Sequence, residues 1–142
     1  MNKKVSTLLV AFAFFVLATI LFLLPGSSFP KQNWLTPILN FIWFDKWVHV
    51  TIFIALVYLW CRAFFHRTSL VARKKNFLFI LTLFIAYGIF IEFVQQRFIL
   101  NRSFEVFDIV ADTSGAVIGF VLASKRFINK ETPVETGVVN QN

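Results

Sequence analysis

Cysteine and charge are both scarce in this sequence. Cys61 is the single cysteine, which excludes a disulfide within the chain and a metal site built from several cysteines. Only 15% of the 142 residues are charged, whereas a soluble globular domain carries about 25%. Hydrophobic residues make up 58% of the chain and 20 residues are Phe. This composition places the chain in the membrane class.

The formal net charge of +7 does not indicate a nucleic-acid-binding protein. The basic residues cluster in short segments between apolar runs, as they do in loops that meet anionic lipid headgroups. We therefore expect membrane lipids as partners and no nucleic acid.

Four apolar stretches are long enough to cross a bilayer core of about 30 Å, which takes about 20 helical residues. They cover residues 5–24, 47–64, 77–95 and 106–123. The sequence therefore predicts an all-α integral membrane bundle of four transmembrane helices. A signal peptide is the alternative for the first stretch, because Lys3 and Lys4 precede it. Its apolar core is longer than the roughly 7–15 residues of such peptides, and no Ala-x-Ala cleavage site follows.

The distribution of Lys and Arg predicts that both termini are cytoplasmic. With the N-terminus inside, ten basic residues are cytoplasmic: Lys3, Lys4, Arg62, Arg67, Arg73, Lys74, Lys75, Lys125, Arg126 and Lys130. Four are on the outer side: Lys31, Lys46, Arg97 and Arg102. Cytoplasmic loops carry the excess of Lys and Arg. We expect one membrane domain over residues 1–126 and a disordered cytoplasmic tail over residues 127–142.

Most polar residues of the last three stretches fall at their outer ends. Ionisable side chains at the edge of the hydrocarbon are costly, so they usually mark a functional site. We expect an outward-facing polar pocket formed by eight residues: Asp45, Lys46, His49, Glu92, Gln95, Arg102, Asp108 and Asp112.

Residue spacing suggests roles within this pocket. Asp45 and His49 are four apart and share a helix face, so Asp45 either fixes the imidazole of a general base or only caps its helix. Glu92 is either kept ionised by a pairing with Lys46 or Arg102, or is a neutral, hydrogen-bonding structural group. Lys46 and Arg102 suit a phosphate or carboxylate. We assign catalytic roles to His49, Asp45, Glu92 and Asp108, and binding roles to Lys46, Gln95, Arg102 and Asp112.

Two further patterns occur in the last stretch. Glu105 precedes it, where negative charge is favourable near a helix N-terminus. Small residues then recur every fourth position: Ala111, Gly115, Gly119 and Ala123. Such spacing allows close helix approach, which would bring Asp108 and Asp112 toward the neighbouring helices.

The ordered set of motifs resembles the VanZ-like family over about residues 43–120. The motifs are Asp45-Lys46-x-x-His49, Glu92-x-x-Gln95, Arg102-Ser103, and Asp108-x-x-x-Asp112-x-x-Gly115-x-x-x-Gly119. The resemblance implies a bacterial inner-membrane protein of the cell envelope and a link to glycopeptide (teicoplanin) resistance. Two departures exist: the family often has Asn at the place of Asp112, and a Pro-Gly often precedes the loop arginine where Leu100 and Asn101 stand here.

Several functions fit this pattern. In the first, the pocket binds or processes an envelope lipid or a lipid-linked cell-wall precursor. No obvious nucleophile is present, so this hypothesis leaves enzymatic activity open. Alternatively, the polar network fixes helix packing and the choice of another envelope protein as partner. A transporter is disfavoured, because the inner half carries few polar groups. A metal held among His49, Asp45, Asp108, Asp112 and Glu92 is a variant, but no compact motif supports it, so we assign no metal and no cofactor.

Overall fold

The computed structural model describes residues 3–24, 44–65, 69–99 and 103–128. Within these ranges the chain forms four helices, which are α1 (Lys3–Leu23), α3 (Phe44–Phe65), α4 (Leu70–Phe98) and α5 (Val106–Phe127). All four are long and apolar enough to span a membrane. The predicted all-α, four-span architecture is confirmed, and the predicted tail lies outside the described residues from position 129 onward.

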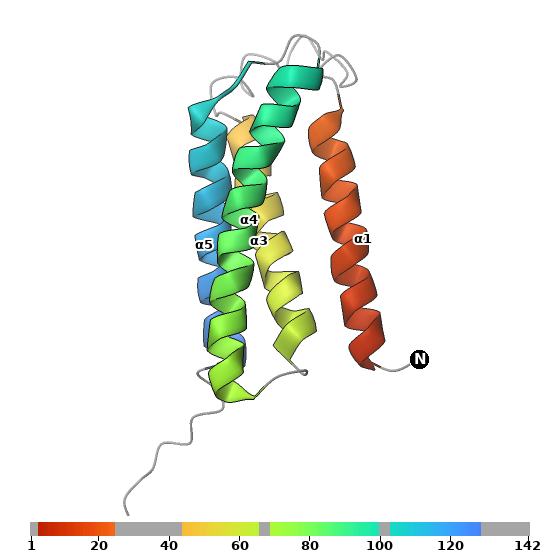
Figure 1. Cartoon of the computed structure of the whole chain (residues 1–142), viewed down its shortest axis with the longest axis vertical. Helices are drawn as coiled ribbons and strands as arrows, with labels where there is room; N and C mark the ends of the chain where they lie inside the picture. Colours follow the sequence, from red (N-terminus) through yellow and green to blue (C-terminus); the bar gives the residue numbers. More distant parts are fainter. Residues whose placement is uncertain (1–2, 25–43, 66–68, 100–102, 129–142) are drawn as a thin grey trace, which may run out of the picture.

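The helices lie side by side and alternate in direction (Figure 1). Helices α3, α4 and α5 form the compact part of the bundle, and α1 packs against α3 and α4. The ends of α1 and α4 and the starts of α3 and α5 therefore meet at one end of the molecule (Figure 1). We call this the polar end, and we call the opposite end, where Arg62, Arg73 and Lys125 lie, the basic end.

Helix α4 begins seven residues before the predicted span, at Leu70 rather than Phe77. The added turns contain Arg73, Lys74 and Lys75, which favour helix but lower the hydropathy that marks a span. Buried Arg73 donates from Nη1 to the carbonyl oxygen of Phe127 at 2.9 Å, and its guanidinium lies 4.3 Å from the ring centre of Phe65. These contacts attach the start of α4 to the ends of α3 and α5.

The small-residue stripe of α5 packs directly on the backbone of α3. A Cβ atom at Gly119 would lie 2.6 Å from the carbonyl oxygen of Ile54, and one at Gly115 would collide with the carbonyl oxygen of Val50. Ala111 and Ala123 are buried on the same stripe. The predicted close approach is confirmed, and it brings the acidic start of α5 against the start of α3.

Hydrophobic side chains cover the outside of the bundle as well as its core. Large apolar residues such as Leu17, Phe79 and Val110 are more than half exposed. In water such an apolar surface would be an aggregation hazard, but in a bilayer it faces lipid. The core beneath it contains fully buried Phe53 and Leu56. The chain is thus a multi-pass membrane protein.

Candidate functional site

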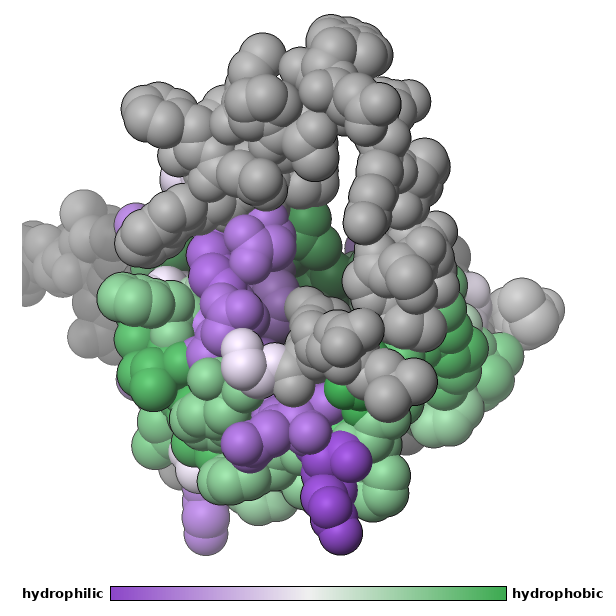
Figure 2. Space-filling model, turned by 90° about the horizontal axis from the view of Figure 1, so that it is seen from above, coloured by the Kyte–Doolittle hydropathy of each residue, from purple (hydrophilic) through white to green (hydrophobic). Residues whose placement is uncertain are grey.

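Hydrophilic side chains gather at the polar end and hydrophobic ones surround them (Figure 2). Seven of the predicted site residues lie near helix termini at this end. Asp45, Lys46 and His49 belong to the start of α3, Glu92 and Gln95 to the last turns of α4, and Asp108 and Asp112 to the first turns of α5. Five of these side chains are at least 97% buried: His49, Glu92, Gln95, Asp108 and Asp112. The structure therefore brings together seven of the eight predicted residues, and Arg102 lies outside the described residues.

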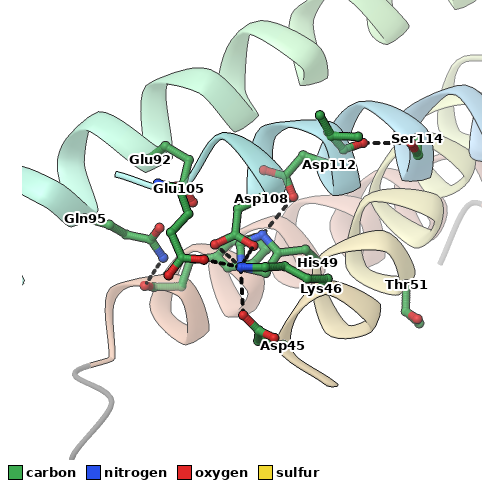
Figure 3. Close-up of polar contacts among 12 residues, drawn as sticks. Asp45, Lys46, His49, Thr51, Glu92, Gln95, Glu105, Asp108, Asp112 and Ser114 are labelled. Carbon is green, nitrogen blue, oxygen red and sulfur yellow. Dashed lines mark hydrogen bonds and ion pairs between the residues drawn. The ribbon is translucent and has the colours of Figure 1, made fainter. Parts of the chain in front are cut away.

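Lys46 lies among three carboxylates (Figure 3). Its Nζ atom is 2.8 Å from Oδ2 of Asp45 and 2.6 Å from Oδ1 of Asp108, and it also donates to Oε2 of Glu105. Asp45 and Glu105 are about half exposed, whereas Asp108 is buried. An ammonium group has three N–H donors, and here three acidic side chains surround it. Lys46 therefore joins α3 to the start of α5.

His49 is paired with Asp112 and not with Asp45. Its Nδ1 atom lies 2.9 Å from Oδ1 of Asp112, and both side chains are buried. This partner differs from the predicted one because the glycine stripe of α5 presses Asp112 against the start of α3. A carboxylate accepts the Nδ1–H of a neutral imidazole and leaves the Nε2 lone pair free. The Nε2 atom points toward Oδ2 of Asp108, 4.0 Å away.

Residues from the other three helices surround His49. The ring of Phe22, near the end of α1, packs on the imidazole with ring centres 4.7 Å apart. Glu92 of α4 and Asp108 of α5 each offer an oxygen that lies within 4.8 Å of a His49 nitrogen and of the other oxygen. The imidazole of α3 therefore lies between side chains of α1, α4 and α5.

Glu92 lies six residues before the last residue of α4, about 9 Å along the helix axis. Its Oε2 atom accepts a hydrogen bond from the backbone N–H of Glu105 at 3.3 Å. The other oxygen, Oε1, is buried and has no hydrogen-bond partner among the described residues. The predicted partner Lys46 instead contacts Asp45, Glu105 and Asp108.

Gln95 connects α4 to α1. Its Nε2 atom donates to the backbone carbonyl oxygen of Phe22 at 2.8 Å. That carbonyl belongs to the last turn of α1, whose terminal carbonyls have no partner within the helix. Gln95 therefore holds α1 beside the site, where the Phe22 ring packs on His49.

Two contributors to the site were not predicted. Glu105 was interpreted only as a favourable charge near a helix N-terminus, yet its side chain binds Lys46 and its N–H binds Glu92. Glu105 is the N-cap residue of α5, and its carbonyl oxygen accepts a hydrogen bond from the N–H of Asp108 at 3.0 Å. The acidic residue three positions before Asp108, at the start of the helix, is the sequence signal for it. Gly88 is the other: a Cβ atom there would lie 2.9 Å from Oδ2 of Asp112, so glycine allows α4 to approach this carboxylate.

The site contains more acidic side chains than basic ones. Among the described residues, the polar end has five carboxyl groups, on Asp45, Glu92, Glu105, Asp108 and Asp112, and the basic side chains Lys46, His49 and Arg97. Arg97 is exposed, whereas Lys46 contacts the buried carboxylate of Asp108. An oriented imidazole beside buried carboxylates can transfer protons or hold a cation.

Comparison with known proteins agrees with this arrangement. The model of the VanZ/LLP1 family matches residues 4–129, which include all four spans and every residue of the polar cluster. No curated protein and no solved structure matches the chain. The expected resemblance is therefore confirmed, and it extends beyond the predicted range at both ends. The chain is a member of the VanZ/LLP1 family.

Proposed function

We propose that the polar end binds or processes the headgroup of an envelope lipid or of a lipid-linked cell-wall precursor. The observation that carries this proposal is the buried pair of His49 and Asp112, with the Nε2 atom of His49 directed toward Asp108. Helix packing alone does not require a histidine whose second nitrogen faces another acid. In this proposal His49 is the general base or acid, Asp112 fixes its orientation, and Asp108 and Glu92 are its partners at the reacting headgroup.

The position of the cluster along the helices supports a headgroup as ligand. Asp45, His49 and Asp108 lie within the first two turns of α3 and α5. Residues at the termini of spanning helices lie near the boundary between hydrocarbon and headgroups. A lipid headgroup can therefore reach this depth while its acyl chains contact the apolar outer surface of the bundle.

The basic end defines the proposed orientation. Arg62, Arg73, Lys74, Lys75, Lys125 and Arg126 all lie there among the described residues. Because Lys and Arg are retained in the cytoplasm, we infer that both termini are cytoplasmic and that the polar end faces outward. We propose the inner membrane of a bacterium as its location, with the polar end at the outer leaflet, where lipid-linked precursors are exposed. The association with glycopeptide (teicoplanin) resistance comes from the family alone.

A second candidate is an accessory protein that acts only through packing. The contacts of Lys46 with Asp45, Glu105 and Asp108, and of Gln95 with the Phe22 carbonyl, favour it because they fix helix register. Buried polar contacts within membranes contribute only about 0.6 kcal/mol each on average. In this alternative the cluster specifies the surface that meets another envelope protein.

Substitutions separate the two candidates. We expect His49→Gln and Glu92→Gln, which keep a polar side chain at each position, to keep normal membrane abundance and to abolish an envelope phenotype, such as altered glycopeptide susceptibility. Arg102→Ala extends the set to the loop residue. Ser114→Ala is the matched control, because exposed Ser114 lies on α5 beside the site and, among the described residues, its hydroxyl donates to the carbonyl of Val110. Loss of abundance in both site variants would favour the packing role.

A further inference from the structure

We infer that His49, Glu92 and Asp108 form a three-ligand site for a divalent transition-metal ion, Zn²⁺ or Mn²⁺. One nitrogen of His49 and one oxygen from each carboxylate lie within 4.8 Å of one another, and all three residues are buried. They come from three different helices, α3, α4 and α5. The remaining coordination positions would take a phosphate oxygen of the headgroup, a step that rests on the function proposed above.

The separation of the ligand atoms suits a small ion. Bonds from Zn²⁺ to imidazole nitrogen or carboxylate oxygen measure about 2.0–2.2 Å, so tetrahedral ligands lie about 3.4 Å apart. The Nε2 atom of His49 and Oδ2 of Asp108 are 4.0 Å apart, too far for a hydrogen bond. A movement of roughly 0.7 Å by each side chain brings even the longest separation to the tetrahedral value.

Asp112 supplies the supporting contact that a metal-binding histidine requires. Its Oδ1 atom accepts the hydrogen bond of Nδ1 at 2.9 Å. Histidine ligands almost always donate their other ring N–H in this way, which fixes the tautomer and makes the binding nitrogen more basic. Here that nitrogen is Nε2, the atom that faces Asp108.

An unpartnered buried oxygen is the independent sign of a missing ligand. Oε1 of Glu92 is buried and has no hydrogen-bond partner among the described residues, and Glu92 is only 1% exposed. A buried carboxylate oxygen without a partner is costly. The same carboxylate lies within reach of His49 and Asp108. A cation between the three groups would satisfy this oxygen.

Lys46 does not fill the proposed site. Its ammonium group contacts Oδ1 of Asp108, together with Asp45 and Glu105. Asp108 therefore faces Lys46 with one oxygen and His49 with the other. One imidazole and two carboxylates suit Zn²⁺ or Mn²⁺ better than Mg²⁺, which prefers an octahedron of oxygen ligands and retains its waters. A bound ion would also offset the negative charge that otherwise repels a phosphate.

Metal titration of the purified full chain in detergent tests this site directly. After chelator treatment, Zn²⁺ and Mn²⁺ are each titrated against a competing indicator, and bound metal per chain is measured by mass spectrometry. We expect one ion per wild-type chain and at least tenfold weaker binding in Glu92→Gln, which removes a ligand charge while keeping the side-chain shape. Absence of stoichiometric binding of both ions by the wild-type chain overturns the proposal without any variant.

Ser114→Ala is the control, because exposed Ser114 lies on α5 and belongs to neither group of acidic and histidine side chains at the polar end. It should bind the metal as the wild type does, and equal loss in Ser114→Ala and Glu92→Gln overturns the assignment of ligands. Lipid binding is measured on the same samples. Metal binding without lipid binding supports the site and refutes the proposed function. Lipid binding without metal binding refutes the metal site alone.

Discussion

The Nδ1 atom of His49 lies 2.9 Å from Oδ1 of Asp112, although 63 residues separate the two in the chain. Both residues are buried, on α3 and α5 respectively. The pair exists because glycines 115 and 119 let the two helices approach until their backbones touch. The pair leaves the Nε2 atom of His49 facing Asp108. The proposed role of His49 as a general base or acid depends on this arrangement.

Replacement of Asp112 separates its charge from its hydrogen bond. Asp112→Asn keeps an oxygen acceptor for the Nδ1–H of His49, so we expect a change of less than about 1 kcal/mol in the free energy of unfolding. Asp112→Leu leaves that buried N–H without an acceptor and should cost about 1–3 kcal/mol. Unfolding of the purified protein in mixed detergents measures both values, and equal stability of the two variants would contradict the pairing.

Gly115 is expected to tolerate no larger side chain. Any Cβ atom there collides with the carbonyl oxygen of Val50, so Gly115→Leu must force α5 away from α3. Overpacking of this kind costs about 1–3 kcal/mol or more, and folded protein should fall sharply in detergent extracts. Ser114→Leu, at the exposed neighbouring position, is the control and should extract normally. Similar losses from both substitutions would argue against the described α3–α5 contact.

Lys46→Met should destabilise the polar end. The substitution keeps an unbranched side chain but removes the cation between Asp45, Glu105 and buried Asp108. Loss of a charged hydrogen-bond partner costs about 1–3 kcal/mol, which should lower the melting temperature by several degrees. Arg97→Met removes an exposed cation at the same end and should change the melting temperature little. A Lys46→Met protein that melts at the same temperature as Arg97→Met would contradict the stabilising role of the Lys46 contacts.

Cysteine labelling tests the orientation of the bundle. Cys61 is the single cysteine of the chain, so Cys61→Ala gives a background without thiols. In that background, Ser103→Cys places a thiol at the exposed polar end and Ser69→Cys places one at the exposed basic end. A membrane-impermeant thiol reagent added to spheroplasts should label the Ser103→Cys protein only. Labelling of the Ser69→Cys protein alone would show that the orientation is the opposite of the one proposed.

Hydropathy and topology predict much of this structure. Four spans follow from the apolar runs, and their alternating direction brings the termini of α3, α4 and α5 to one end. The early start of α4 was missed because Arg73, Lys74 and Lys75 lower the hydropathy without opposing helix formation. Hydropathy records transfer to lipid, whereas the contact of Arg73 with the Phe127 carbonyl depends on tertiary packing.

Within the site, membership was easier to predict than pairing. Asp45 was assigned to His49 because the two are four residues apart on one helix, yet Asp112 is the carboxylate that binds it. Local spacing does not reveal the rotation of α5 against α3, which the contact between Gly115 and Val50 fixes. The catalytic and binding roles of the cluster stay predictions.

The central claim is that the buried cluster around His49 binds a headgroup. Native mass spectrometry of protein purified in mild detergent measures it most directly, through the lipids that stay bound to wild type, His49→Gln and Ser114→Ala. We predict that wild type and Ser114→Ala retain the same phosphate-containing lipid and that His49→Gln, folded to the same extent, loses it. Retention of an identical set of lipids by a folded His49→Gln protein would contradict the claim.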